Sequence, residues 1–400
     1  TIGNADIVSE IIRCDFSNKN KSKRSEEGSS RAFPDFCGFG TAYLPKYLPP
    51  LLENDYTVVI VDQLEQANER RGKLVKRGIV AVHSPCLKAC DLETFNDTDS
   101  YLLGVSLEIV LPKSKNFDNV VIYSVCSVNN TTNTIEITEN IIQCKENEFR
   151  NALEDLGKVL SRYNTKTLRL FYLSDFTESD IYSRALIKYL DEQSSINNYI
   201  YKIDHIQKDS KIYIDYCKRQ YKNEYFKRIY KHIDFGLVDP LEYLNLHDKD
   251  ISSLNFMFVL DFIAKHDLKY VNNLQLPVII NETSNLVLEL NTLQQLNLLP
   301  NRLVTNNKIT SVFDVINHTC TAIGRRHLKN LLTKPFRNKD IIQFRYDLSN
   351  RIQHFDENKL KHLEKLLSTC IDFDRLHRKM GLEALHPYEF EKLDLSYTKI

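Results

Sequence analysis

Several kinds of residue and pattern are scarce or missing in this 400-residue chain. Tryptophan is absent and methionine occurs only twice, but these two shortages carry no information about mechanism. The 53 basic side chains balance the 53 acidic ones, so the chain has no net charge that would attract nucleic acid. Any affinity for DNA must therefore come from local clusters of cations.

Long apolar runs are also missing. No uninterrupted apolar segment is long enough to cross a membrane, and the first residues do not form a secretory signal. The nine cysteines are scattered and odd in number, which is typical of free thiols in a reducing compartment. The length leads us to expect about two to four domains, and the 42% hydrophobic content is enough to bury their cores. The missing signal and the cysteines lead us to expect a protein that is not secreted.

The 11 glycines nowhere form a phosphate-binding loop. Such a loop reads Gly-x4-Gly-Lys-Ser/Thr, because backbone amides and the lysine must hold the phosphates of a nucleotide. Gly72-Lys73 lacks both the preceding glycine and the following hydroxyl. We therefore expect no ATPase site in these residues. The chain begins with Thr1 and not with methionine, so we expect a fragment.

The most informative stretch that is present covers residues 311–355. Ser311 followed by Asp314 predicts a capping-box-like start for a short helix. A second helix is expected at about 319–333, because Pro335 disfavours helical geometry at the residue before it.

Asn338 can cap a third helix in this stretch. Its apolar stripe at helical spacing consists of Ile341, Leu348, Ile352 and Phe355. Because the turns are very short, we expect the three helices to pack on each other. Gly324, inside the second helix, costs stability relative to alanine, so we expect close packing against a neighbour there.

The stretch resembles the core-domain signature of the MutS family of DNA mismatch-repair proteins. The family pattern is Thr-x-x-Gly-x-Arg-x-Leu, then Leu-x-x-Pro, then Ile-x-x-Arg. The matching residues are Thr321, Gly324, Arg326, Leu328, Leu332, Pro335, Ile342 and Arg345. Residues 372–376 resemble the Asp-x-x-Arg-Leu that starts the family's lever helices. The resemblance implies that these segments have a structural role and no catalytic role.

The first part of the chain predicts a small α/β domain. Residues 4–14 and 42–53 have helical patterns, and 72–84 predict a strand pair. Residues 57–63 form a continuous apolar, β-branched strand, which we expect to be buried on both faces.

Residues 38–66 resemble the MutS mismatch-binding domain, and 4–21 resemble the helix and loop before it. Gly40 stands where the family usually has proline, Ala42 where it often has histidine, and Ser84-Pro85-Cys86 where it has Thr-Pro-Gly. In the family a Phe-x-Glu pair just upstream stacks on the unpaired base and hydrogen-bonds to it. The chain begins after that point.

The resemblance places the DNA-binding candidates in this domain. Cations in the loop and near the later strands can contact phosphates, which supply affinity without sequence information. The alternative is that the charged loop is simply solvated. The candidates are Lys19, Lys21, Lys23, Arg24, Phe39, Thr41, Lys73, Lys76 and Arg77.

From residue 101 onward, three strands are followed by alternating helices and strands, which predicts an α/β domain with a mixed sheet. The order resembles the ribonuclease-H-like connector of MutS. Nucleases of this shape hold two metal ions with carboxylates, and Glu108, Asp155 and Asp175 are the available candidates. MutS connectors are not nucleases, so this enzyme hypothesis rests on fold analogy alone.

Two further segments leave alternatives open. Residues 217–232 interleave cations with aromatics, which suits either nucleic-acid binding or an amphipathic helix with its aromatics in the core. Cys86 and Cys90, with His83 nearby, suggest either free thiols or half of a zinc site whose second ligand pair is missing.

Together these patterns predict a multidomain protein. We expect a truncated mismatch-binding-like α/β domain at 1–92, a ribonuclease-H-like connector at 99–238, and all-α core and lever helices at 239–400. The resemblance implies double-stranded DNA as partner, a homodimer or a heterodimer with another MutS-like subunit, and ATP with Mg²⁺ in the intact protein. It also implies a location wherever the DNA is. A MutS relative that binds recombination junctions is the alternative function.

Overall fold

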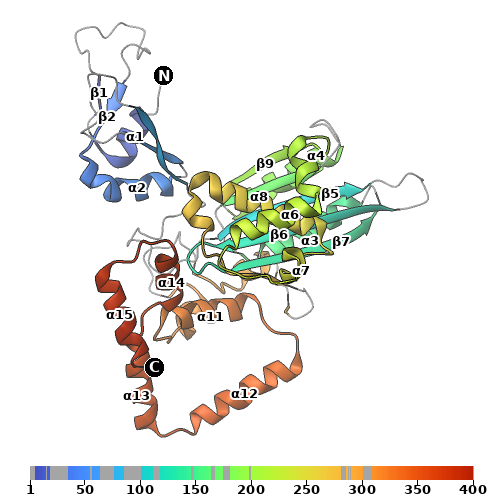
Figure 1. Ribbon diagram of the computed structural model, residues 1–400. Helices are drawn as coiled ribbons and strands as arrows, with labels where there is room; N and C mark the ends of the chain where they lie inside the picture. The colour runs from blue at the N-terminus through green and yellow to red at the C-terminus, as the bar shows by residue number, and fades with distance from the viewer. Residues whose placement is uncertain are drawn as a thin grey trace. The chain divides into compact units, whose positions relative to one another are not determined.

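The computed structural model in Figure 1 describes residues 5–14, 16–18, 35–54, 56–63, 76–84, 101–110, 118–145, 148–163, 167–173, 181–197, 200–280, 285–286, 288, 290–300 and 309–399. The chain divides into two units, Thr1–Asn96 and Asp97–Ile400, and each is described by itself. Among the helices in the described ranges, none combines the length and the apolar composition needed to span a lipid bilayer.

Unit 1 is a small arrangement of helices and short strands. Its elements are α1 (Ala5–Ile12), β1 (Phe16–Asn18), β2 (Asp35–Cys37), the 3₁₀ helix η2 (Thr41–Tyr43), α2 (Leu44–Glu53), β3 (Val58–Gln63) and β4 (Arg77–His83). β1 pairs antiparallel with β2, and β3 pairs antiparallel with β4. Leu48 and Leu52 of α2 are buried and pack with Val58 of β3 into a small core.

Two expectations for unit 1 were wrong. β3 is not buried on both faces, because 48% of Val59 and 56% of Val61 are exposed. A continuous apolar run shows that a strand can be buried, but it does not show what covers it. Residues 76–84 contain the single strand β4 and not a strand pair, and residues 72–75 lie outside the described part of the chain.

A six-stranded mixed sheet forms the framework of unit 2. Its strands are β5 (Tyr101–Val110), β6 (Asn119–Asn129), β7 (Ile135–Cys144), β8 (Thr167–Leu173), β9 (Ile200–Ile206) and β10 (Pro277–Ile279). The order across the sheet is β10-β7-β6-β5-β8-β9. The pairs β5–β6 and β6–β7 are antiparallel, whereas β5–β8, β8–β9 and β10–β7 are parallel.

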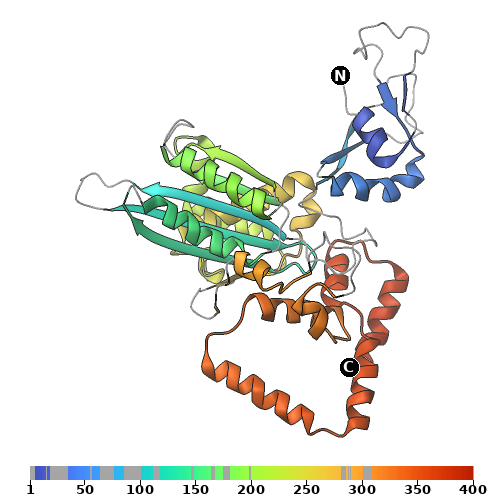
Figure 2. The same ribbon diagram turned by 180° about the vertical axis from the view of Figure 1, so that it is seen from behind.

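The helices α3 (Phe149–Leu160) and α4 (Ile181–Asn197) cover one face of this sheet (Figure 2). The expected stripe of α3, from Phe149 to Tyr163, is buried in the core that they share with the sheet. Odd-numbered side chains of β5, such as Val105, lie in that core. Because successive strand residues point to opposite faces, Gly104 faces the other side, where it approaches α8 (Asp250–His266).

Further short elements surround α8. These are α5 (Lys211–Cys217), α6 (Arg219–Ile229), α7 (Pro240–Tyr243) and the 3₁₀ helix η5 (Leu268–Val271). The sequence predicts nearly all-helical structure after about residue 239, yet β10 joins the sheet beside β7. A three-residue strand is too short to show a period of two, which is why the sequence pattern does not reveal it. The boundary at 238/239 stays a prediction.

The last part of the chain is helical. Its helices are α9 (Leu290–Gln295), α10 (Val312–Ile316), α11 (Ala322–Thr333), α12 (Lys339–Gln353), α13 (Glu357–Ser368), α14 (Phe373–Gly381) and α15 (Pro387–Tyr397). Two expected caps are confirmed. The Ser311 hydroxyl accepts from the Asp314 amide at 3.2 Å, and the Asn338 side chain accepts from the Asp340 amide at 2.8 Å.

Three expectations for these helices differ from the structure. α11 begins at Ala322, because Thr321 is extended and caps it by accepting from the Gly324 amide. A side chain at Gly324 would meet the Thr321 hydroxyl at 3.0 Å, so its close neighbour is the helix's own cap and not another helix. No residue of α12 is buried, and 47% of Leu348 in the expected stripe is exposed, so the three helices do not enclose a common core.

Candidate nucleic-acid interface

The residues predicted to contact DNA fall into two groups. Phe39, Thr41, Lys76 and Arg77 are described, and all of them are exposed in unit 1. The others lie outside the described residues, namely Lys19, Lys21, Lys23, Arg24 and Lys73. Contact with DNA stays a prediction for both groups.

The segment before α2 folds as a tight turn that presents its side chains outward. The Tyr43 amide donates to the Gly40 carbonyl at 2.9 Å, which closes the 3₁₀ turn that contains Thr41. Pro45 then lies in the first turn of α2, where proline's fixed backbone angle favours the helix. The buried Leu48 and Leu52 in the middle and at the C-terminal end of α2 hold the helix against β3.

Aromatic side chains from this segment form a row. The ring centroids of Phe39 and Tyr47 are 4.7 Å apart, and those of Tyr43 and Tyr47 are 6.5 Å apart. The Lys46 ammonium lies 5.4 Å from the centre of the Tyr47 ring, within cation–π range. Sequence reasoning selected Phe39 but missed Tyr43, Lys46 and Tyr47, although the four-residue spacing of the rings was available as a signal.

Lys76 and Arg77 lie at the start of β4. Arg77 is opposite Gln63 in the antiparallel pair, whereas the acidic Asp62 is opposite Gly78. Because neighbouring residues on a strand point to opposite faces, Arg77 and Asp62 lie on different faces of this two-stranded sheet. The cation is therefore not neutralised by its nearest acidic neighbour along the pair.

The possible zinc site and the thiols of unit 1 give no metal centre in the described part of the chain. Cys86 and Cys90 lie outside it, and within it no group of three or more His, Cys, Asp or Glu residues converges. Cys14 and Cys37 form a separate thiol pair. Burial, and then the hydrogen bond with the Cys14 thiol, raise the pKa of Cys37.

The carboxylates proposed for a nuclease do not converge. The Tyr123 hydroxyl donates to Asp155 at 2.6 Å, and Tyr123 pairs with Leu107 in the sheet. Glu108 follows Leu107 and therefore points to the opposite face, where it forms an ion pair with Lys208 at 2.6 Å. The third candidate, Asp175, lies outside the described residues. A metal pair could not be held by both described carboxylates at once.

The basic and aromatic segment at 217–232 is largely core. Tyr225, Phe226 and Tyr230 are buried, as expected for an amphipathic helix with its aromatics inside. One of its cations is buried too, which the sequence did not indicate. The Lys222 ammonium donates to Asp250 at 2.8 Å and to the Ser253 hydroxyl at 2.7 Å.

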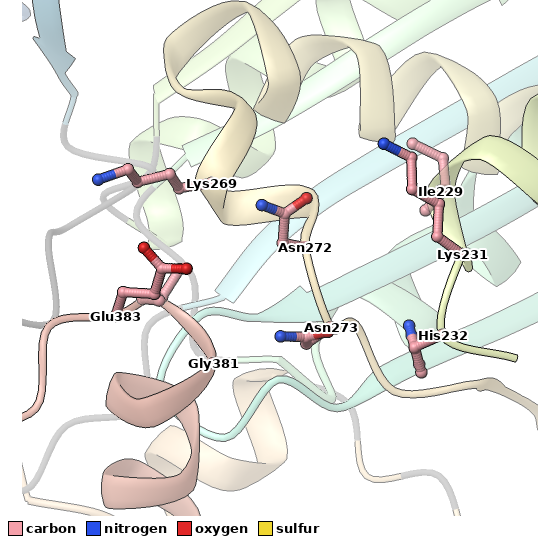
Figure 3. A pocket seen from close by; sticks show the side chains of 9 residues that line it. Ile229, Lys231, His232, Lys269, Asn272, Asn273, Gly381 and Glu383 are labelled. Carbon is pink, nitrogen blue, oxygen red and sulfur yellow. The ribbon is translucent and has the colours of Figure 1, made fainter.

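A pocket of about 410 Å³ lies in unit 2 where α6, η5 and α14 end (Figure 3). Lys231 and Lys269 line it together with Glu383. The C-terminal ends of α6 and α14 reach the pocket, and helix C-termini carry partial negative charge. Glu383 and these helix ends offset the two lysines, so we assign no anion to this pocket.

The residues of the helical signature join segments of the fold. Arg326 of α11 donates to both Asp372 oxygens, at 2.5 and 2.7 Å, and to Asp374 at 2.9 Å. Lys334, after α11, forms an ion pair with Glu136 of β7 at 3.3 Å. These contacts hold helices and a strand together, which is the structural role that the resemblance implied.

Comparison with known proteins agrees with this arrangement. The MutS domain I family matches residues 3–88, and the MutS domain III family matches residues 291–398. A solved structure of the Fowlpox virus resolvase with Holliday junction DNA covers 41% of this chain and 97% of its own, at 17% identity. Its TM-score of 0.24 is too low to support a statement about the fold.

Similar relatives extend over most of the chain. A mutS homologue of the Acanthamoeba polyphaga mimivirus, named as a DNA mismatch repair protein, is 30% identical over 91% of this chain and 32% of its own length. The DNA mismatch repair protein MutS of Finegoldia magna is 25% identical over 93% of this chain and 37% of its own. The chain thus spans about a third of the length of these relatives. Residues 3–88 thus belong to the MutS domain I family and residues 291–398 to the MutS domain III family, and relatives named for DNA mismatch repair align along nearly the whole chain.

Proposed function

We propose that this chain is the DNA-binding part of a MutS-type mismatch-repair protein and binds double-stranded DNA. The observation that carries the proposal is the match of residues 3–88 to MutS domain I. The exposed Lys76 and Arg77 of the same unit can contact phosphates, and the exposed turn with Phe39 and Thr41 adds a second contact surface. The described relatives are named for DNA mismatch repair.

On this proposal, the middle of the chain is a connector of the ribonuclease-H type, as the resemblance implied. The core order β7-β6-β5-β8-β9, with β6 antiparallel to both neighbours and β8 and β9 parallel to β5, supports this assignment. The two described carboxylates lie on opposite faces of the sheet, which favours a structural role over catalysis. The domain limits 1–92, 99–238 and 239–400 remain part of this proposal.

ATP, Mg²⁺ and dimer formation belong to the same proposal, by likeness to the family. No phosphate loop occurs in the 400 residues, so we assign no residue of this chain to hold the nucleotide or the metal ion. The partner subunit would be a second copy or another MutS-like chain. The protein would act wherever its DNA is, in a nucleus, an organelle, a bacterial cytoplasm or a viral replication site.

The test is a titration of the chain with matched duplex, mismatched duplex and a four-way junction at several salt concentrations. We expect weak duplex binding with a steep salt dependence, because the contacts are to phosphates. We expect no preference for the mismatch, because no Phe-x-Glu pair occurs in residues 3–88. Changing Lys76 and Arg77 together to alanine should lower the slope of log affinity against log salt by up to about two.

The matched control changes the exposed Lys359 and Lys361 of α13 to alanine, which removes the same charge from unit 2. The slope should not change in this control. Duplex binding that is absent or insensitive to salt would contradict the proposal. Binding that is much tighter to the junction than to either duplex would favour the alternative, a MutS relative that binds recombination junctions.

A further inference from the structure

The aromatic row of unit 1, formed by Phe39, Tyr43 and Tyr47, is largely open to solvent. 58% of Tyr43 and 37% of Phe39 are exposed. Other apolar residues of the same segment behave differently, because Leu48, Leu51 and Leu52 are buried. The rings are therefore not simply the core side of α2: Phe39 and Tyr43 are exposed and Tyr47, which both contact, is half-buried, so the three form one contiguous aromatic surface that a ligand could cover.

The charged group recorded against the row is a cation. The Lys46 ammonium lies over the Tyr47 ring, and Lys46 is the only charged residue of the segment 36–52, which Asp35 and Glu53 flank in the sequence. Lys46 is itself exposed, so its charge is available to a ligand. A ligand for this surface should therefore combine flat apolar groups with negative charge.

Single-stranded nucleic acid has this combination. Its bases are flat and stack on aromatic side chains, while its phosphates pair with nearby cations. Bases inside a duplex are already stacked on each other and cannot reach a protein ring without leaving the helix. The row thus suits unpaired bases, whereas Lys76 and Arg77 suit the phosphates of either form.

We propose that Phe39, Tyr43 and Tyr47 form a stacking surface for the bases of single-stranded DNA, with Lys46 beside it to contact a phosphate. The proposal rests on the proposed function, that unit 1 binds DNA, and adds an unpaired strand to its ligands. Stacking needs no hydrogen bonds to base edges, so the surface would accept any sequence.

The experiment compares an oligothymidylate with an abasic oligonucleotide of the same length, because the two carry the same phosphates and differ only in their bases. Binding to the whole 400-residue chain is measured by fluorescence of an end-labelled strand. The chain has no tryptophan, so quenching of intrinsic tyrosine emission provides a second readout. We expect the unmodified chain to bind the oligothymidylate about 5- to 100-fold more tightly than the abasic strand.

The variants separate stacking from charge. Tyr43→Ala should remove most of the preference for the oligothymidylate and leave both the affinity for the abasic strand and the salt slope unchanged. Tyr43→Phe should keep the preference, because the ring remains. Lys46→Ala should instead lower the salt slope by about 0.7, the value expected for one phosphate contact on a single strand.

Tyr388→Ala is the matched control. Tyr388 of α15 is an exposed tyrosine with a lysine, Lys392, 5.3 Å from its ring centre, but it lies in unit 2. Removing it should change neither the affinity nor the preference. The control therefore excludes a general effect of deleting an exposed ring next to a cation.

The outcomes distinguish this inference from the proposed function. A chain that binds duplex but prefers neither strand contradicts only the stacking surface, whereas a chain that binds no DNA contradicts both. Equal losses on the two strands in Tyr43→Ala, or no loss, also contradict stacking. A dimer in sedimentation that dissociates in Tyr43→Ala would show that a second copy covers the row, which overturns the inference.

Discussion

Gly104 lies where α8 crosses β5, and its missing side chain determines how close the helix can approach. A β-carbon at this position would lie 2.0 Å from a Val259 methyl carbon and 3.2 Å from the Asn255 side-chain oxygen. The Asn255 amide donates to the carbonyls of Gly104 at 3.0 Å and of Ser124 at 2.9 Å. Helix α8 is thus fixed to the sheet by hydrogen bonds that a side chain would push apart.

We therefore expect Gly104→Ala to destabilise unit 2 by about 1–3 kcal/mol, because the added methyl overpacks the contact with Val259. The free energy of unfolding in urea measures this change. Gly381→Ala in α14 is the control, since its β-carbon would lie at an ordinary 3.5 Å from Asn273. The control should change stability by less than about 0.5 kcal/mol. Equal stability of the two variants would contradict the close approach of α8.

Asp261 of α8 is a second residue with a measurable consequence. Burial raises its pKa from 3.8 to about 6, against the lowering effect of Lys265. The hydroxyls of Tyr216 and Tyr225 both donate to its carboxylate. The pKa is higher in the folded than in the unfolded state, so the folded state binds the proton more tightly between about pH 4 and pH 6.

The contribution of Asp261 to stability should therefore fall as the pH rises from about 4 to about 6, so the stability of the unmodified chain relative to Asp261→Asn should fall over the same range. The full shift corresponds to about 3 kcal/mol, but Asp261 is partly open to water, so we expect about 1 kcal/mol. Urea unfolding of both proteins at pH 4, 5, 6 and 7 measures the difference. Tyr225→Phe should raise the pKa further, because the carboxylate loses a donor. Parallel pH profiles would contradict this assignment.

At the scale of elements, the signature segment works by joining α11 to α14. Arg326 holds Asp372 with two hydrogen bonds, and Asp372 also caps α14 by accepting from the Arg375 amide. The same guanidinium reaches Asp374 in the first turn of α14. Arg326 of α11 thus fixes both the start and the orientation of α14, although α12 and α13 lie between α11 and α14 in the sequence.

We expect Arg326→Lys to destabilise the chain by about 1–3 kcal/mol, because an ammonium group cannot hold two carboxylates with the geometry of a guanidinium. Arg150→Lys is the matched control. Arg150 makes ion pairs with Glu154 and Glu192 at the surface, so the change should cost less than about 0.5 kcal/mol. Thermal unfolding of both variants checks the comparison. Equal melting temperatures would mean that Arg326 is not structurally important.

At the scale of the whole molecule, sequence patterns were informative where an element lies in a closed core. The stripe of α3 and strands β5 to β9 follow from their periodicity, because both faces of that sheet are covered. The exposure of β3 and α12 did not follow, since an apolar pattern cannot show which partner covers it. The rings of Tyr43 and Tyr47 were not recognised as possible contact residues, because aromatic residues next to buried leucines resemble core residues in the sequence.

The last prediction at this scale concerns catalysis. We expect the 400 residues to hydrolyse neither ATP nor DNA with Mg²⁺ or Mn²⁺. The sequence has no phosphate loop, and Glu108 is paired with Lys208 on the face of the sheet opposite Asp155. Incubation with labelled duplex and single strands, and with labelled ATP, measures both activities, with Glu108→Ala and Asp155→Ala as paired variants. Cleavage lost in both variants would require the two carboxylates to meet at a metal, and would replace the mismatch-repair proposal with a nuclease.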